Sequence, residues 1–340
     1  MQVSTVSERN RPAQNSFIDF LKRLLRVREF ALIVMIVAIG LALQLLTGRF
    51  LTTANLNAIM LGFATSAIIV VGMTSALVSG GFDLSVGSVF AMGGVTAAVA
   101  LRAGVPILPA MGVGVLAGVA AGLVNGLVIT KVGINPFITT LGMLSIARGV
   151  SLAITEGSPL ASLPSEFFVF GQGKTADIPN LILIALSIVL IGDVLMRRSA
   201  WFRQIYYVGG NEDAARLSGI NVARVKIGVY TLSAALAALA GVLSVSRFTV
   251  ADPGAGSGEE LRIIAACIIG GCSLQGGKGS VFGGLLGLIF VGFINNGMVL
   301  LHVAVYYQQL AMGFVLLLAV GFDTVNQRRM QRGGRAKKAA

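Results

Sequence analysis

The chain has 340 residues, of which 55% are hydrophobic and only 12% are charged, and its formal net charge is +12. Soluble domains carry roughly 25% charged residues, so this composition excludes a soluble globular protein and indicates that lipid is the main solvent. The 44 glycines are typical of helical membrane proteins, in which small residues let helix backbones approach closely.

The chain begins with a polar segment, residues 1–29, that carries six basic residues. The apolar run that follows, 30–46, has no good small-residue cleavage site before Arg49. We therefore expect an uncleaved first transmembrane helix rather than a signal peptide that is removed.

Nine further apolar runs approach the roughly 20 residues that a membrane-spanning helix needs. The sequence thus predicts an all-α polytopic membrane protein of about ten transmembrane helices. The expected spans are 30–47, 55–78, 84–101, 107–130, 137–155, 178–196, 226–247, 258–273, 280–300 and 304–323.

The basic residues predict the orientation of these spans. With the N-terminus inside, twenty of the 26 Lys and Arg residues lie on the cytoplasmic side, five lie outside and Arg148 falls within a span. The cytoplasmic residues concentrate in the two terminal segments and in the loop 197–226. This asymmetry follows the positive-inside rule and predicts that both termini are cytoplasmic. Because the charges form no contiguous patch, they do not indicate nucleic-acid binding.

Three segments follow from this pattern: a basic N-terminal segment 1–29, a transmembrane domain 30–323 that contains the loop 197–226, and a basic C-terminal tail 324–340. The longest predicted outside connection, 156–180, is too short for a domain.

No G-x-x-x-x-G-K-[ST] motif occurs, so any use of ATP would require another subunit. The two cysteines form no disulfide framework, and a single histidine offers no His-based metal site. We expect no catalytic residue, no cofactor and no metal.

Two short segments of similar sequence interrupt the apolar runs. GGFDL precedes GSVF in 80–90, and GGCSL precedes GSVF in 270–282. Transporters often contain repeats whose interrupted helices line the substrate path. Chance similarity in a glycine-rich chain is the alternative explanation. We expect some of the helices to be interrupted at these glycine pairs.

Charged residues within membrane spans are costly and indicate function by default. Asp83 follows a Gly-Gly pair, where it either caps the next helix or contacts substrate. Arg148 lies deep in its span and is expected to pair with an acid or with backbone carbonyls. Asp193 lies near Arg197 and is expected to form an interfacial ion pair.

Four amides lie in or beside the predicted spans: Asn125, Asn135, Asn295 and Asn296. Such side chains most often hydrogen-bond neighbouring helices, although neutral amides also suit a neutral polyhydroxylated solute. With Asp83 they form the candidate translocation path. The path lacks the stacked carboxylates and His or Lys relays that ion-coupled transporters need.

The segment 250–262 is predicted to be an extracellular loop that leads into a helix. Ser257 and Glu260 have the spacing of a capping box. Asp252 and Glu259 are candidates for docking an external binding protein, and the alternative is a solvated helix start.

The segment 209–226 is polar and charged in a chain that is otherwise apolar, so it is expected to meet a partner outside the membrane. Glu212 and Arg216 are spaced i, i+4, which favours a short helix. The small residues Ala214, Ala215 and Gly219 would allow another protein to approach closely.

Five motifs resemble the membrane permease subunits of bacterial monosaccharide importers of the ATP-binding-cassette class, with the ribose permease branch most similar. They are GGFDLSVGS (80–88), NPFITTLGMLSIARG (135–149), GGNEDAARLSGINVARVK (209–226), GGCSLQGGKGSVFG (270–283) and FINNG (293–297). The resemblance runs from about residue 30 to 323 in the same order. It implies a permease in the bacterial inner (plasma) membrane that catalyses no covalent step.

The same resemblance implies three kinds of partner: a cytoplasmic ATP-binding-cassette ATPase, an extracytoplasmic sugar-binding protein and a second permease copy. It also implies a coupling helix that lies in a groove of the ATPase. The residues assigned to that contact are Asn211, Glu212, Ala214, Ala215, Leu217, Ser218 and Gly219. Asp213 is inserted relative to the broader Glu-Ala-Ala motif of importers, which leaves the individual side-chain roles open.

Two alternatives remain at the level of the sequence: a stand-alone secondary transporter of a small polar solute, and a channel or scaffold without energised transport. Neither would need a docking segment such as 211–219, so that segment favours the importer permease. The sequence does not identify which sugar is carried.

Overall fold

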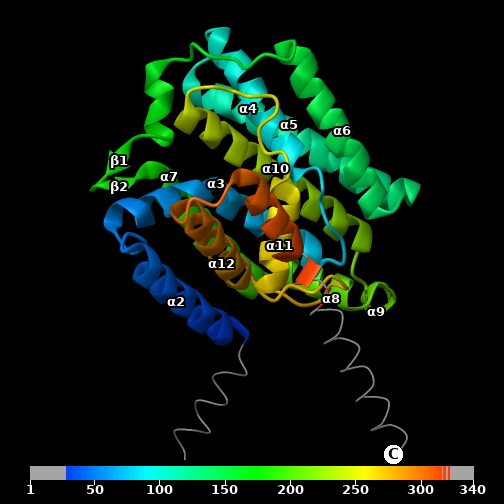
Figure 1. Ribbon diagram of the computed structural model, residues 1–340. Helices are drawn as coiled ribbons and strands as arrows, with labels where there is room; N and C mark the ends of the chain where they lie inside the picture. The colour runs from blue at the N-terminus through cyan, green and yellow to red at the C-terminus, as the bar shows by residue number, and fades with distance from the viewer. Residues whose placement is uncertain (1–27, 316, 319–320, 322–340) are drawn as a thin grey trace, which may run out of the picture.

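The computed structural model describes residues 28–315, 317–318 and 321 (Figure 1). Most of the basic segment 1–29, the end of the predicted span 304–323 and the whole tail 324–340 lie outside the described residues. The elements, in order, are α2 (Arg28–Thr47), α3 (Thr53–Val78), α4 (Val86–Arg102), α5 (Ile107–Leu127), the π-helix η1 (Val128–Val132), α6 (Pro136–Thr155), the 3-10 helix η2 (Ser165–Phe170), β1 (Lys174–Thr175), β2 (Ile178–Pro179), α7 (Asn180–Arg198), α8 (Ala200–Gly210), α9 (Glu212–Leu217), α10 (Val222–Phe248), α11 (Glu259–Ile269) and α12 (Val281–Leu300). Further helical residues begin at Val305.

Helices dominate this fold, as expected for an all-α polytopic membrane protein. Within the described residues, seven helical stretches are long and apolar enough to cross a membrane: α2, α3, α5 continued by η1, α6, α7, α10 and α12. The helix α4 is apolar but has only 17 residues. The two short strands pair with each other as an antiparallel hairpin before α7.

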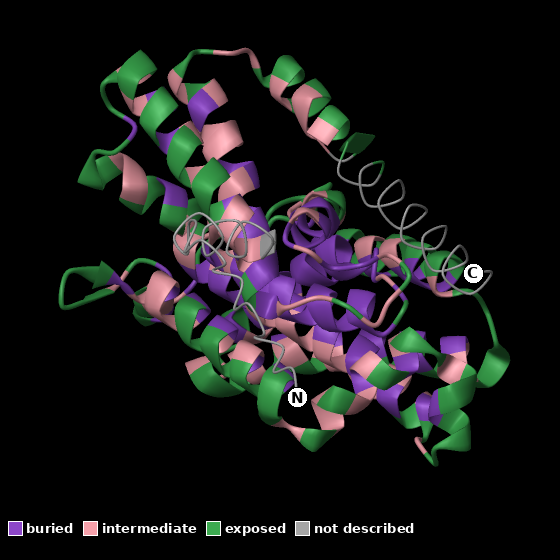
Figure 2. Cartoon of the chain, turned by 90° about the horizontal axis from the view of Figure 1, so that it is seen from below, coloured by how far each residue is buried: buried purple, intermediate pink, exposed green. Residues whose placement is uncertain are grey.

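The helix α10 is the centre of the bundle, where it packs against α3, α4 and α5 (Figure 1). Small residues make this packing close: a Cβ added to Gly72 of α3 would lie 2.6 Å from the Cα of Ser233 in α10. Buried residues therefore gather in the middle of the molecule, while the outer helices expose much of their surface (Figure 2). Large apolar side chains such as Leu116, Ile138 and Leu190 are more than half exposed, which fits contact with lipid.

The helix α11 is shorter than the predicted span 258–273. It has 11 residues, or about 16 Å of helix, which is about half of the hydrocarbon thickness of a bilayer. The helix ends at Gly270, and Gly271 follows with a φ of +108°. Residues 270–280 continue without regular helix until α12 begins. The apolar composition of 258–273 predicted a complete span, but the helix ends within it at the glycine pair, where the sequence also predicted an interruption.

The two segments of similar sequence, 80–90 and 270–282, contain the breaks between α3 and α4 and between α11 and α12. These two breaks lie against each other. The Gly277 N–H donates a hydrogen bond to the Val78 carbonyl across 2.8 Å. Gly276 lies against Gly80 and Gly209, and Gly277 lies against Gly210. We call Gly80, Gly209, Gly276 and Gly277 the glycine junction. It joins both interrupted helices to the C-terminal end of α8.

Candidate functional site

The polar segment 209–226 forms the short helix α9 between α8 and α10. Asn211 begins α9, because its side-chain oxygen accepts a hydrogen bond from the Ala214 N–H at 2.9 Å. Gly219 ends the turn with a φ of +81°, a conformation that glycine adopts without the strain of a Cβ. The predicted coupling segment is therefore a helix with defined ends.

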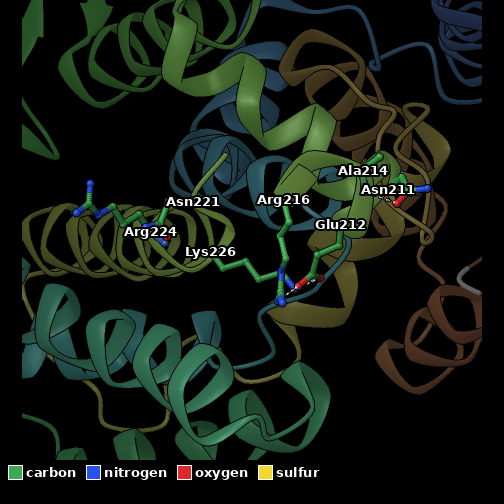
Figure 3. Close-up of polar contacts among 7 residues, drawn as sticks. All are labelled: Asn211, Glu212, Ala214, Arg216, Asn221, Arg224 and Lys226. Carbon is green, nitrogen blue, oxygen red and sulfur yellow. Dashed lines mark hydrogen bonds and ion pairs between the residues drawn. The ribbon is translucent and has the colours of Figure 1, made fainter. Parts of the chain in front are cut away.

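Glu212 fixes the direction of α9 relative to α10. Its carboxylate forms ion pairs with Arg216 at 3.0 Å and with Lys226 of α10 at 2.5 Å (Figure 3). Partial burial acts to raise the pKa of Glu212, but the hydrogen bonds and charges of Lys226 and Arg216 outweigh it and hold the pKa below its ordinary value. The i, i+4 pair with Arg216 was predicted, whereas the pair with Lys226 was not.

The two faces of α9 differ in exposure. Leu217 is 91% exposed and Ala215 is 3% exposed. Asn211, Ala214, Ser218 and Gly219 are exposed together with Leu217. A short helix with small residues and one large apolar side chain on its free face can enter a groove of another protein. The structure places Ala215 on the opposite face, packed into the hydrophobic core.

Side chains beside α9 connect the end of α7 and α8 to the start of α12. The Tyr206 hydroxyl donates to the Gly279 carbonyl at 2.9 Å. The Asp193 carboxylate accepts from the Phe282 N–H at 3.1 Å and forms the predicted ion pair with Arg197 at 2.7 Å. With the glycine junction, these contacts tie α8 to residues 276–282.

Two of the five predicted path residues meet inside the bundle. The Asp83 carboxylate accepts hydrogen bonds from the Ser85 N–H at 3.0 Å and from the Ser85 hydroxyl at 2.5 Å. The Asn125 amide donates to the same hydroxyl at 3.1 Å. Both Asp83 and Asn125 are fully buried. Asp83 thus hydrogen-bonds to Ser85, and Ser85 rather than Asp83 is the N-cap residue of α4.

The other three predicted path residues lie elsewhere. Asn135 caps α6, accepting from the Phe137 N–H at 2.8 Å, and is exposed. Asn296 exchanges two hydrogen bonds of 3.0 Å with Asn55, which joins α12 to the first turn of α3. Asn295 is half-buried beside it. The structure therefore does not bring the five residues into one site.

The loop before α11 is held by a residue of α6. Arg148 donates to the carbonyls of Pro253 and Ala255, which are one of the two kinds of partner that the sequence predicted, an acid being the other. The predicted capping box is wrong: Gly258 is the N-cap residue of α11, and the Ser257 hydroxyl donates to the Gly254 carbonyl instead. A glycine with a φ of +82° can begin the helix here without a side-chain cap.

A cavity of about 530 Å³ lies at the end of α10 that is farthest from α9. We call it the outer cavity. Its walls come from α3, α4, the last turns of α10, the loop that follows and the first residue of α11. Both predicted docking residues line it, Asp252 at the exposed rim and Glu259 half-buried. It also includes Ser66 and Arg247, which the sequence reading did not select.

Glu259 points toward the helix bundle. Its carboxylate accepts a hydrogen bond from the buried Ser66 hydroxyl of α3 at 2.9 Å and pairs with Arg262 at 2.7 Å. The signal available in the sequence was the polar pair Thr65-Ser66 inside an otherwise apolar span. The partner of that pair lies 193 residues away, so only the fold shows the contact.

Comparison with known proteins identifies the family. Residues 55–320 match the family described as branched-chain amino acid transport system, permease component. The chain belongs to this permease family. It is similar to the ribose import permease proteins of Escherichia coli strain K12 (40% identical, covering 88% of this chain and 95% of the relative) and Bacillus subtilis strain 168 (39% identical, covering 82% and 88%). It also resembles the L-arabinose transport system permease protein of Escherichia coli strain K12 (35% identical, covering 88% and 92%). No solved structure matches the chain.

Membership in this permease family settles the class of the protein. The chain is a multi-pass transport subunit of the inner membrane and not an enzyme. The candidate coupling helix α9 and the outer cavity lie at opposite ends of its central helix.

Proposed function

We propose that this permease provides the path by which an ATP-driven importer carries a monosaccharide, ribose or a related sugar, across the membrane. The observation that carries the proposal is the identity of 35–40% to permeases named for ribose and arabinose along 88% of the chain. The exposed α9 supports it, because a transporter that works alone has no use for such a docking helix.

In this proposal, α8 and α9 face the cytoplasm and the outer cavity faces the outside. The chain crosses the membrane ten times, with α4 as a short crossing and with α11 and the residues after it as an interrupted one. Both termini are then cytoplasmic. The excess of Lys and Arg in the terminal segments and in 197–226 supports this orientation.

The coupling contact rests on the exposed residues of α9. Leu217 inserts into a groove of the ATPase, and Ala214, Ser218 and Gly219 let the two backbones approach. Glu212 orients the helix through its ion pairs, and Asn211 caps it. Ala215 anchors α9 to the permease core, so it supports the contact from behind.

Three partners complete the importer: a cytoplasmic ATP-binding-cassette ATPase, an extracytoplasmic sugar-binding protein and a second permease copy. The path includes polar residues of the bundle, for which Asp83, Asn125, Asn135, Asn295 and Asn296 are candidates. Asp252 is exposed at the rim of the outer cavity, where the binding protein would release its sugar.

Replacement of Gly219 by Trp tests the coupling contact. A Cβ at Gly219 meets nothing within 4 Å, and the strain at its positive φ costs only about 1–2 kcal/mol, so the permease should fold while the added ring blocks the ATPase groove. We expect Gly219→Trp to abolish ATP-driven sugar uptake in proteoliposomes and to leave the docking of the binding protein intact.

Gly133→Trp is the matched control. Gly133 is exposed, has a φ of +83° and also has nothing within 4 Å of an added Cβ. This variant should import sugar at the rate of the unmodified permease. Full ATP-driven uptake by Gly219→Trp would reject the assignment of α9 as the coupling helix.

A further inference from the structure

The outer cavity has the size and lining of a small-molecule site. Its volume of about 530 Å³ falls within the range of ligand pockets in proteins, roughly 300–1,000 Å³. Apolar walls come from residues such as Ile69 and Phe90, and polar groups come from Ser66, Arg247 and Glu259. It thus combines an apolar surface with a few directed hydrogen-bonding groups.

The charged groups of the outer cavity, Arg247, Asp252 and Glu259, carry both signs, and each has hydrogen-bonding partners in the protein. Glu259 is paired with Arg262. The Arg247 guanidinium donates to the Leu61 carbonyl at 2.5 Å and lies 4.8 Å from the Phe248 ring centre. With Arg262, which pairs with Glu259, two basic residues balance the two acidic ones. The cavity therefore suits a neutral ligand better than a phosphate, a carboxylate or an amine.

The hydrogen-bonding groups favour a ligand that donates. A carboxylate can accept several hydrogen bonds through its two oxygens, and those of Glu259 and Asp252 both line the cavity. The hydroxyls of Thr65, Ser66 and Ser244 can donate or accept. Carboxylates and hydroxyls that line one cavity match the hydroxyl groups of a polyol, each of which both donates and accepts.

We propose that the outer cavity is a sugar-binding site within the permease, in which Glu259 and Ser66 bind hydroxyl groups of the monosaccharide as it leaves the binding protein. This assignment rests on the proposed function and replaces the predicted docking role of Glu259. The inward contact of Glu259 with Ser66 supports the replacement, since a docking residue would point away from the bundle.

The site is also connected to the coupling end of the molecule. Ser66 lies on α3, whose last residue, Val78, accepts a hydrogen bond from Gly277. Glu259 begins α11, which leads to the same loop. The helix α3 therefore ends beside the glycine junction, and the loop after α11 contributes Gly276 and Gly277 to it, where α8 meets both. A movement of α8 with the ATPase would separate or close the two sides of the sugar site.

The test uses the full importer, with its ATPase and binding protein, reconstituted in proteoliposomes and supplied with radiolabelled D-ribose, L-arabinose or D-allose. We expect Glu259→Gln to reduce uptake of the transported sugar about tenfold or more, the factor expected when a hydrogen bond to a charged group is lost. Docking of the binding protein, measured by surface plasmon resonance, should stay within about twofold of the unmodified complex. Glu166→Gln makes the same change on an exposed residue outside the cavity and should leave uptake unchanged.

A second pair of variants fills space without removing charge. Gly62 lines the outer cavity, and a Cβ there meets nothing within 4 Å. Gly62→Trp should therefore fold and obstruct the cavity, with a loss of uptake similar to that of Glu259→Gln. Gly142→Trp, at an equally open and exposed position of α6, is the control and should import normally. Elution as an intact complex with basal ATP hydrolysis would show that each variant is assembled.

Uptake at the unmodified rate by both Glu259→Gln and Gly62→Trp would overturn the site. Loss of binding-protein docking by Glu259→Gln would overturn it as well, in favour of a docking surface. If the unmodified complex imports none of the three sugars, the proposed function fails and the sugar site with it. Reduced uptake with intact docking in both variants supports the site.

Discussion

Glu212 is the residue that orients the candidate coupling helix. A six-residue helix is too short to be stable alone in water, so α9 depends on contacts with the rest of the permease. Glu212 supplies one of them, the ion pair with Lys226 on α10, and it also pairs with Arg216 within α9. Because these side chains are partly exposed, each pair contributes only about 0.2–1 kcal/mol. Their role is to direct α9 rather than to stabilise the bundle.

Glu212→Gln should therefore loosen α9 without unfolding the protein. We expect faster amide hydrogen exchange in the peptide that covers 212–218, measured by mass spectrometry of the permease in nanodiscs, and a thermal midpoint close to that of the unmodified permease. The same loosening should follow acidification. Since the pKa of Glu212 is depressed in the folded state, its contribution is complete above the ordinary pKa of Glu, roughly 4.3. It is lost as the pH falls through the lower folded value.

Asp213→Asn is the control for this experiment, because Asp213 is exposed on the same helix and forms no ion pair with α10 in the part of the chain that the structure describes. Exchange in this variant, corrected for the intrinsic rate at each pH, should match that of the unmodified permease. Equal protection of 212–218 in Glu212→Gln would show that packing of Ala215 alone holds α9.

The residue scale also shows where sequence reasoning stops. The pairs Glu212–Arg216 and Asp193–Arg197 were predictable because helical spacing places residues four apart on one face. The pair Ser66–Glu259 was not, because its residues belong to α3 and α11 and meet only after the bundle has assembled. Sequence proximity therefore predicts contacts within a helix, whereas the contacts that form a site depend on tertiary packing.

At the scale of elements, the glycine junction is a close contact between α8 and the two helix breaks. Gly277 has a φ of +71°, and a Cβ there would lie 2.8 Å from the Cα of Gly210. We expect Gly277→Ala to destabilise the permease by strain at positive φ, about 1–2 kcal/mol, and further by overpacking against α8, about 1–3 kcal/mol. It should also reduce ATP-driven uptake, because α8 can no longer pack closely against the two breaks between helices.

Gly104→Ala separates the two causes of this effect. Gly104 has a similar φ of +81°, but an added Cβ meets nothing within 4 Å. Thermal unfolding in detergent should show a smaller loss of stability for Gly104→Ala than for Gly277→Ala, with uptake retained. An equal loss of stability and of uptake in both variants would mean that backbone strain alone explains the effect of Gly277→Ala. The glycine junction would then not transmit the movement of α8.

Helix positions were more predictable than helix lengths. The span predicted at 137–155 corresponds to α6 at Pro136–Thr155, and the span predicted at 280–300 corresponds to α12 at Val281–Leu300. Apolar runs bounded by polar residues determine such helices directly. In 258–273 hydropathy gives no warning of a break, and the close approach of Gly270 to Gly283 on α12 decides where α11 ends.

At the scale of the whole molecule, the central helix buries many small residues and the outer helices expose many large apolar ones. The central α10 carries several fully buried alanines, such as Ala234, Ala237 and Ala240, while the outer helices present leucine and isoleucine to their surroundings. In lipid, close packing of small residues holds helices together better than apolar burial does. The fold class follows from composition for this reason, and the order of packing around α10 does not.

The same molecule-wide arrangement predicts which loops reach each side of the membrane. Cysteine substitutions at three exposed positions test it: Ser158 before α7, Ser218 after α9 and Ser257 after α10. Since Cys267 and Cys272 are buried, a membrane-impermeant maleimide should report mainly on the introduced thiols. In intact cells we expect labelling of Ser158→Cys and Ser257→Cys. Ser218→Cys should be labelled only after the membrane is permeabilised, since α7 and α10 each separate it from an outer loop. Labelling of Ser218→Cys in intact cells would reverse the orientation, and it would place α9 where no cytoplasmic ATPase can reach it.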